Sequence, residues 1–193
     1  MMSLFVPTAN AQQTDVYTVK WGDSLWKISK KYKIGLSEII NANPQFENPD
    51  LIYPGDKVTI PLKRNIKSIE RQVVKYTNQY RQQNGLAPVK VDWQLSRVAR
   101  YKSRDMRDQG YFSHNSPTYG SPFKMMRDFN IHYTRASENI AAGQPTAKAV
   151  VDAWMNSSGH RRNILDANVT HIGVGYAEGG SYGNYWTQMF IKK

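Results

Sequence analysis

The chain turns from strand to helix within Tyr17-Thr18-Val19-Lys20-Trp21-Gly22-Asp23-Ser24-Leu25-Trp26-Lys27-Ile28-Ser29. Residues 16–20 alternate between apolar and polar side chains, as a short strand does. Leu25, Ile28 and Tyr32 then recur at spacings of three and four, which indicates an amphipathic helix. Asp23 stands between the two patterns, where it can act as a helix N-cap. This stretch therefore predicts a strand that leads directly into a helix.

The residues that follow complete a small unit. Ser37 is the predicted cap of a second helix, which ends before Pro44. The turn sequence Tyr53-Pro54-Gly55-Asp56 precedes a closing strand over residues 57–60. The predicted order is strand, helix, helix, strand within residues 16–62, so we expect a small βααβ module here.

This unit resembles a LysM domain over its whole length. Besides the opening stretch, Asn41-Ala42-Asn43-Pro44 and Leu51-Ile52-Tyr53-Pro54-Gly55-Asp56-Lys57-Val58-Thr59-Ile60-Pro61 are similar to the middle and end of that family's pattern. The resemblance implies binding of N-acetylglucosamine-containing glycans, such as peptidoglycan or chitin, in a groove between two loops. The implied glycan-binding residues are Gly22, Asp23, Ser24, Leu25, Pro49, Asp50, Leu51, Ile52 and Tyr53.

Such a groove suits its ligand physically. A neutral N-acetyl sugar offers an amide, hydroxyls and apolar C–H faces, so it requires backbone polar groups and a few apolar side chains rather than charges. The alternative is that Leu25, Ile52 and Tyr53 belong only to the hydrophobic core.

The second predicted unit begins after a short charged linker, residues 63–67, and covers residues 68–193. Its expected elements are a helix ended by Asn84-Gly85, a helix capped by Asp92 and stopped at Gly110, a helix over 123–129, a helix from Thr146 to Trp154, and strands over 172–177 and 185–191. Helices before and between strands favour an α+β fold built in layers.

Five segments in this unit resemble the CAP domain shared by cysteine-rich secretory, antigen 5 and pathogenesis-related 1 proteins, in its bacterial, YkwD-like branch. They are Thr77-Asn78-Gln79-Tyr80-Arg81, Phe112-Ser113-His114-Asn115-Ser116, Ser137-Glu138-Asn139-Ile140-Ala141, Trp154-Met155-Asn156-Ser157-Ser158-Gly159-His160-Arg161 and Ile172-Gly173-Val174-Gly175. The resemblance implies an α-β-α layered domain with a cleft that contains His114, Glu138 and His160.

The chain departs from that family pattern at one cleft position. The familiar second Glu, three residues after Trp154, is Ser157 here, and the nearby Asp152 lies at another helical phase. This departure weakens any mechanism that needs two carboxylates.

Two other kinds of chemistry stay open for the cleft. His114 and His160, with Glu138, could hold a divalent ion such as Zn²⁺, although we expect no cofactor to be required. A serine hydrolase could use Ser116, Ser157 or Ser158, which lie near the two histidines in sequence, although serines at helix ends are more often caps. His132 and His171 are interpreted as surface or strand-end residues.

Composition bears on location and partners. The chain has no cysteine, which for a secreted protein suggests a bacterial exterior. Residues 1–15 are interpreted as a signal-peptide remnant and tail, since Ala9-Asn10-Ala11 resembles a cleavage site. The net charge is +11, and residues 63–110 hold twelve Lys and Arg against four Asp and Glu, a net +8. Anionic wall polymers are therefore candidate partners, and sequence-specific nucleic-acid binding is not expected.

We therefore expect a secreted, extracellular protein of the cell wall, whose LysM module binds peptidoglycan and presents a CAP cleft for ligand or metal binding. A metal-dependent or acid–base hydrolase of wall or protein substrates is one alternative. A structural component is the other, because the LysM segment also resembles that of a spore-coat protein, which places a spore coat or cortex among the expected locations. The missing second carboxylate favours binding over catalysis. We expect no transmembrane segment.

Overall fold

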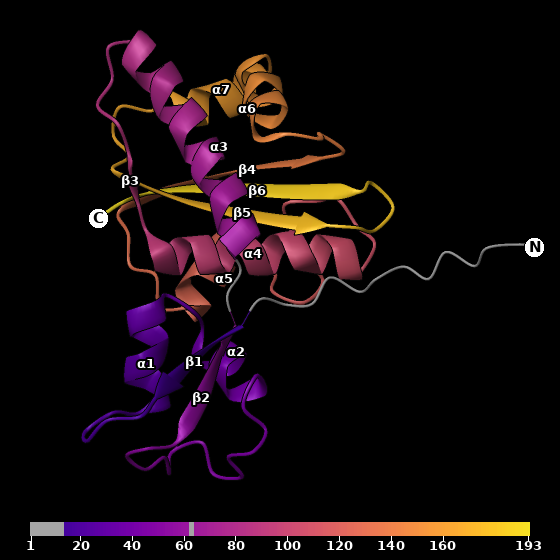
Figure 1. Ribbon diagram of the computed structural model, residues 1–193. Coiled ribbons are helices and arrows are strands. Elements are labelled where there is room, and N and C mark those ends of the chain that lie inside the picture. Colours follow the sequence, from indigo (N-terminus) through magenta and orange to yellow (C-terminus); the bar gives the residue numbers. More distant parts are fainter. Residues whose placement is uncertain (1–13, 62–63) are drawn as a thin grey trace, which may run out of the picture. The chain divides into compact units, whose positions relative to one another are not determined.

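The protein consists of two compact units that divide between Arg64 and Asn65 (Figure 1). The computed structural model describes residues 14–61 and 64–193. Most of the predicted signal-peptide remnant, residues 1–13, therefore lies outside the described residues. The predicted linker over 63–67 needs correction, because residues from Arg64 onward already belong to a helix. No helix of the described part is long and apolar enough to cross a bilayer.

The first unit has the expected βααβ order: β1 (Thr14–Thr18), α1 (Leu25–Tyr32), α2 (Leu36–Asn41) and β2 (Lys57–Pro61). The two strands pair antiparallel, with Thr14 opposite Pro61 and Thr18 opposite Lys57. Strand β1 begins at Thr14, so the tail predicted up to residue 15 is two residues too long.

Both predicted helix caps in this unit were wrong by one or two residues. Helix α1 is capped by Ser24, whose hydroxyl accepts a hydrogen bond from the Lys27 amide at 3.2 Å. Helix α2 starts after Gly35, and the Gly35 amide donates to the Glu38 carboxylate at 3.0 Å. Each predicted residue is polar and close to the helix start, but the backbone geometry selects a neighbour.

The unit has its own hydrophobic core. The core consists of Val19, Leu25, Ile28, Ile34, Ile39, Val58 and Ile60. Asn43 is buried beside it and joins α2 to β2, since its side chain accepts from the Thr59 amide at 2.7 Å and donates to the Ile39 carbonyl at 2.8 Å. A closed core with satisfied polar groups allows this unit to fold on its own.

The second unit surrounds a four-stranded sheet of order β3-β5-β6-β4. Its elements are α3 (Arg64–Gln83), β3 (Lys90–Val91), α4 (Trp93–Asp108), α5 (Pro122–Asp128), β4 (Arg135–Ala142), α6 (Ala147–Met155), α7 (Ser158–Ile164), β5 (His171–Glu178) and β6 (Asn184–Lys192). Only the short pair β3–β5 is parallel. The sequence analysis missed β3, β4 and α7, and it predicted the other elements.

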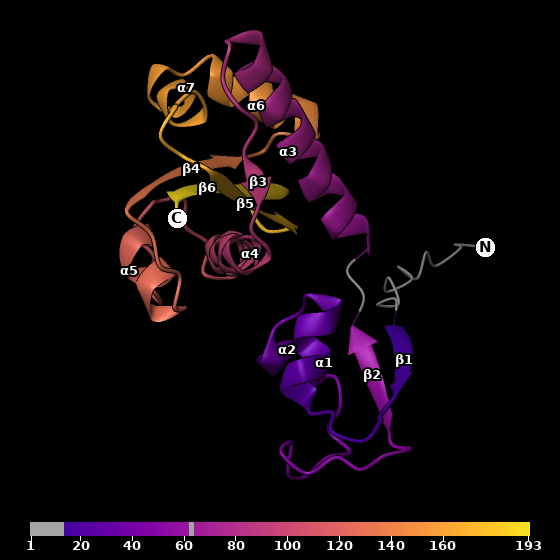
Figure 2. The same ribbon diagram turned by 90° about the vertical axis from the view of Figure 1, so that its left-hand side faces the viewer.

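Helices cover both faces of this sheet, as the layered fold requires. Helices α3, α6 and α7 lie on one face and α4 and α5 on the other (Figures 1 and 2). The alternation along β6 serves both layers, because Trp186 and Phe190 belong to the core under α3 and α6, whereas Met189 and Ile191 belong to the core under α4 and α5.

Two glycines of β5 bring the sheet very close to α4. A Cβ atom placed on Gly173 would lie 2.4 Å from the Leu95 carbonyl carbon, and one on Gly175 would lie 2.1 Å from that of Ala99. Glycine is therefore required at both positions by the close approach of helix and sheet. This packing fixes α4, from whose end the cleft loop departs.

Candidate functional site

Hydrogen bonds join the segments that flank the two candidate glycan-binding loops of the first unit. The Val19 amide donates to the Asp56 carbonyl at 2.9 Å, and the Gly55 amide donates to the Val19 carbonyl at 2.9 Å. These bonds join the start of the β1–α1 loop to the end of the α2–β2 connection. The two predicted loop segments, which are far apart in the sequence, are thus connected by hydrogen bonds between the residues that flank them.

The predicted glycan-binding residues divide into supporting and exposed side chains. Leu25 is 2% exposed and belongs to the core, and Ile52 packs against the same core. Leu51 and Tyr53 are instead 56% and 64% exposed. Leu25 is therefore a core residue, Ile52 is partly buried against the core, and Tyr53 is too exposed to belong to it.

The remaining residues of these loops mainly set the backbone. Gly22 has φ +80°, a conformation that favours glycine. The Asp23 carboxylate accepts from the Lys20 amide and the Tyr17 hydroxyl, both at 2.8 Å, and these bonds lower the pKa of Asp23. Ser24 caps α1, Pro49 is half-buried and Asp50 is exposed. The β1–α1 loop is thus stabilised by internal hydrogen bonds.

Two exposed tryptophans flank the first loop and were missed by the sequence analysis. Trp21 is 91% exposed and Trp26 is 53% exposed. Exposing an indole ring to water is unfavourable, and aromatic rings commonly contact the ligand in small-molecule binding sites. The sequence signal that could have identified these tryptophans is that one aromatic residue stands on each side of Gly22-Asp23-Ser24-Leu25.

In the second unit, the three predicted cleft residues lie on separate elements, and two of them are in direct contact. His114 lies in the loop after α4, Glu138 lies on β4 and His160 lies on α7. The Nδ1 atom of His114 is 2.7 Å from Oε1 of Glu138. The Glu138 side chain is 1% exposed, whereas that of His114 is 51% exposed. The carboxylate of Glu138 is therefore buried, whereas the His114 imidazole bound to it is half-exposed to solvent.

Burial shifts the pKa values of both Glu138 and His160. It raises the pKa of Glu138 above its ordinary value, and the hydrogen bond with His114 and the charge of Lys102 offset this only in part. Burial also lowers the pKa of His160, and the nearby His114 lowers it further. At neutral pH, His160 is therefore uncharged, which is the form that accepts a hydrogen bond or binds a metal.

A buried lysine holds the loop that carries His114. The Lys102 ammonium donates to the carbonyls of Ser113 at 2.7 Å and His114 at 2.8 Å, and to the Tyr111 hydroxyl at 3.2 Å. Lys102 is 1% exposed, and burial lowers its pKa. The sequence analysis missed this residue, because a lysine within an amphipathic helix is usually solvated.

A buried aspartate organises the next part of the same loop. The Asp105 carboxylate accepts from the hydroxyls of Ser116 and Thr118, both at 2.6 Å, and from that of Tyr111. Burial opposes its ionisation, yet these bonds hold the pKa of Asp105 below its ordinary value. Ser116 is thereby a loop-forming residue rather than a free nucleophile, which argues against the serine-hydrolase alternative at that position.

The second carboxylate of the cleft is absent, as the sequence indicated. Ser157 is the N-cap residue of α7 and makes no side-chain capping bond. Asp152 faces α3, since it accepts from the Tyr80 hydroxyl at 2.9 Å, and it does not replace the missing acid. Glu138 is left as the cleft carboxylate, and its buried Oε2 atom has no hydrogen-bond partner among the described residues.

These side chains do not form a ready-made metal site. Within residues 14–61 and 64–193, no group of three or more His, Cys, Asp or Glu side chains could hold a metal ion. Nδ1 of His114 is also engaged by Glu138. A divalent ion on His114 and His160 stays a prediction, and with so few protein ligands we expect it to be held weakly.

The two remaining histidines lie away from this cleft. His132 is exposed and follows α5, and His171 begins β5, where its Nδ1 is 2.8 Å from the Thr170 hydroxyl. These positions match the interpretation as surface and strand-end residues.

We expect Glu138→Gln to stabilise the second unit at pH 7. A raised pKa means that the folded protein binds this proton more tightly than the unfolded chain does, so ionisation above about pH 4.3 costs folding free energy. A neutral isostere removes this cost, and the gain should vanish as the pH falls below about 4. Thermal unfolding of both proteins between pH 3 and 8 measures the difference.

The control for this experiment is Glu178→Gln, because Glu178 is exposed at the end of β5. Its substitution should leave the pH profile unchanged. A Glu138→Gln protein that is less stable than wild type at pH 7 would show that the carboxylate contributes net stability.

Comparison with known proteins adds sequence and structural relatives. Residues 74–190 match the cysteine-rich secretory protein family, and residues 17–61 match the LysM domain. An uncharacterized protein of Bacillus subtilis, YkwD, is 57% identical over 129 residues, which are 67% of this chain and 49% of that protein. SpoIVD-associated factor A of B. subtilis is 48% identical over 46 residues, 24% of this chain and 12% of that protein.

A solved structure supports the same fold. An extracellular protein of Bacillus anthracis that contains an SCP domain is 36% identical, with a TM-score of 0.60, over 72% of this chain and 47% of that one. The chain thus spans about half the length of YkwD and of this protein.

Proposed function

This chain belongs to the cysteine-rich secretory protein family and carries a LysM domain in front of the family domain, and from this we propose that it is a wall-associated binding protein. The LysM unit would hold peptidoglycan, and the cleft of His114, Glu138 and His160 would recognise a ligand brought to the wall.

One observation carries the first half of the proposal: the side chains of Leu51 and Tyr53 stand exposed on the α2–β2 connection, whose end is hydrogen-bonded to the start of the β1–α1 loop. A rigid surface of backbone polar groups and apolar side chains suits a neutral N-acetyl sugar. Trp21 and Trp26 extend the aromatic surface beside it. We therefore assign peptidoglycan, or a chitin-like glycan, to this unit.

The second half follows from the chemistry of the cleft. A half-exposed imidazole oriented by a buried carboxylate can donate and accept hydrogen bonds with a polar ligand. The same pair could activate a water molecule as a general base, but neither Ser157 nor Asp152 supplies a second acid, and Ser116 is engaged by Asp105. Binding is thus favoured over hydrolysis.

The proposed location is extracellular, at the cell wall. LysM relatives include SpoIVD-associated factor A and a spore coat assembly protein of Bacillus cereus, so a spore coat or cortex is a second proposed location. The basic side chains of residues 63–110, apart from the buried Arg81, Arg100 and Lys102, would add attraction to anionic wall polymers. This attraction is salt-sensitive, because charges on exposed side chains are screened within about 10 Å at 0.1 M salt.

We expect residues 14–62 alone to sediment with insoluble peptidoglycan, and residues 65–193 alone to stay largely in solution. Because a neutral sugar is held by hydrogen bonds and apolar contact, binding of the LysM unit should survive 1 M salt. The double variant Leu51→Ala, Tyr53→Ala should weaken binding about tenfold or more, since 1.4 kcal/mol corresponds to a factor of ten. Sedimentation at graded wall concentrations measures both effects.

Leu36→Ala is the matched control, because Leu36 is also an exposed leucine of this unit but lies on α2. It should bind as wild type does. Full-length chain on walls with and without teichoic acid, at low salt, tests the anionic attachment separately. An isolated LysM unit that stays in the supernatant, or that 1 M salt releases, would refute the anchoring role.

A further inference from the structure

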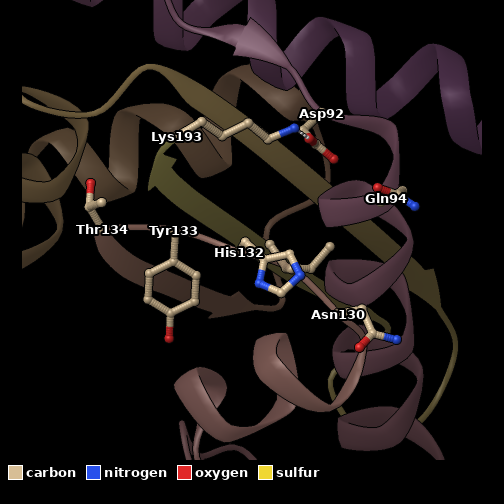
Figure 3. Close-up of a pocket in the computed structure, with 8 residues that line it drawn as sticks. Asp92, Gln94, Asn130, His132, Tyr133, Thr134 and Lys193 are labelled. Carbon is tan, nitrogen blue, oxygen red and sulfur yellow. Dashed lines mark ion pairs between the residues drawn. The ribbon is translucent and has the colours of Figure 1, made fainter.

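The second unit has a cavity of about 480 Å³ beside the start of α4 (Figure 3). Its lining comes from the N-terminal turn of α4, the loop between α5 and β4, and the end of the chain: Asp92, Gln94, Asn130, Ile131, His132, Tyr133, Thr134 and Lys193. None of the cleft residues contributes to it. The volume lies within the range of about 300–1,000 Å³ that is usual for small-molecule sites.

Three planar polar side chains reach this cavity without a partner of their own. The side chains of Gln94, Asn130 and His132 make no hydrogen bond to any residue in the described part of the chain. Each amide provides a donor and an acceptor, and a neutral imidazole provides one of each. These three side chains are exposed, so the cavity offers several directional hydrogen bonds that a ligand can take over from solvent.

The walls around these groups are fixed. The ring of Tyr133 is half-buried against the core under α4 and α5, and its hydroxyl donates to the Phe123 carbonyl at 3.4 Å. Ile131, at 5% exposed, anchors the same loop. Asn130 has φ +58°, which turns the chain sharply before His132. A rigid loop with an aromatic ring and an aliphatic side chain gives the cavity an apolar surface next to its polar groups.

The charges at the cavity cancel. Nζ of Lys193 is 2.5 Å from Oδ2 of Asp92, and Figure 3 shows the lysine extending along one end of the cavity to reach this carboxylate. The other oxygen of Asp92 accepts from the Leu95 amide at 2.8 Å and caps α4. Because Lys193 and Asp92 are paired with each other, a charged ligand finds no unpaired countercharge on these two residues.

We propose that this cavity is a second binding site, for a neutral saccharide unit. Sugar hydroxyls and an acetamido group match the amides of Gln94 and Asn130 and the imidazole of His132, and the C–H face of the ring matches Tyr133 and Ile131. The site is separate from the cleft of His114 and Glu138 and from the LysM loops. It does not depend on the function proposed for either.

Imidazole NMR signals of the full chain test this site selectively. The chain has four histidines, at positions 114, 132, 160 and 171, and all lie outside the LysM unit. Titration with N-acetylglucosamine should therefore shift the His132 signals saturably, while glycan binding by the LysM unit leaves all four unmoved. The signals of His114 and His160 should stay in place.

Variants define the amides involved. Gln94→Ala, and Asn130→Gly, which tolerates the positive φ, should each weaken the His132 response about tenfold, the effect of losing about 1.4 kcal/mol. Gln82→Ala is the matched control, because Gln82 is exposed on α3. It should respond as wild type does.

Three results would overturn the proposal. They are a His132 signal that does not move at any sugar concentration, a response that survives both amide variants, and a shift confined to the cleft histidines. A response to D-alanyl-D-alanine with none to the sugar would assign the cavity to a peptide instead. Loss of wall sedimentation by the LysM unit would leave this site untouched, so the two proposals fail separately.

Discussion

Gly175→Ala should destabilise the second unit by about 3 kcal/mol, which corresponds to a fall of roughly 10 °C in its melting temperature. The new methyl carbon would lie 2.1 Å from the carbonyl carbon of Ala99, in the backbone of α4. A backbone cannot rotate away as a flexible side chain can, so helix and sheet must separate along β5. Calorimetric unfolding of the full chain measures the effect.

The same experiment contains its controls. The LysM unit has a separate core, so its own transition should not move. Gly159→Ala makes the same chemical change within α7, where an added methyl meets nothing within 4 Å, and it should be neutral or stabilising by up to about 1 kcal/mol. A loss below about 1 kcal/mol in Gly175→Ala would mean that α4 shifts easily.

Lys102→Met should cost about 3 kcal/mol and loosen the loop that carries His114. Methionine fills a similar volume but donates no hydrogen bond, so the carbonyls of Ser113 and His114 lose their buried partner. The buried carboxylate of Glu138 also loses a nearby cation. Denaturant unfolding gives the stability, and the imidazole NMR signals of His114 report the loop.

Lys75→Met is the control for this substitution, because Lys75 is exposed on α3. Its stability should stay within about 0.5 kcal/mol of wild type. If Lys102→Met is equally mild and leaves the His114 signals sharp and unmoved, then the lysine does not hold the cleft loop.

Local pattern was enough to predict most elements of both units. The period of two over residues 16–20 and the spacings of Leu25, Ile28 and Tyr32 indicated β1 and α1, and Asp92 and Gly110 marked the two ends of α4. These signals are visible because capping and amphipathic periodicity depend on residues within a few positions of one another. The caps at Ser24 and Gly35 were misplaced because several neighbouring residues can meet the same local requirement.

Elements without such a signal were missed. Strand β4 contains Glu138 and Asn139, both buried, so it lacks the alternation of a half-exposed strand. Asn139 is accommodated because its side chain donates to Gln188 at 3.0 Å and accepts from Asn163 at 2.8 Å. No local sequence pattern predicts a polar strand residue whose hydrogen-bond partners lie 24 and 49 positions away in the sequence.

The cleft residues His114, Glu138 and His160 were identified from the sequence by resemblance, and the absence of a second carboxylate at Ser157 was visible there as well. Tertiary structure alone decided that Glu138 is buried against His114, that Lys102 anchors the loop and that Gln94, Asn130 and His132 line one cavity. The physical reason is that local order depends on neighbours along the chain, whereas burial, protonation and convergence depend on groups that meet only when helices pack on the sheet.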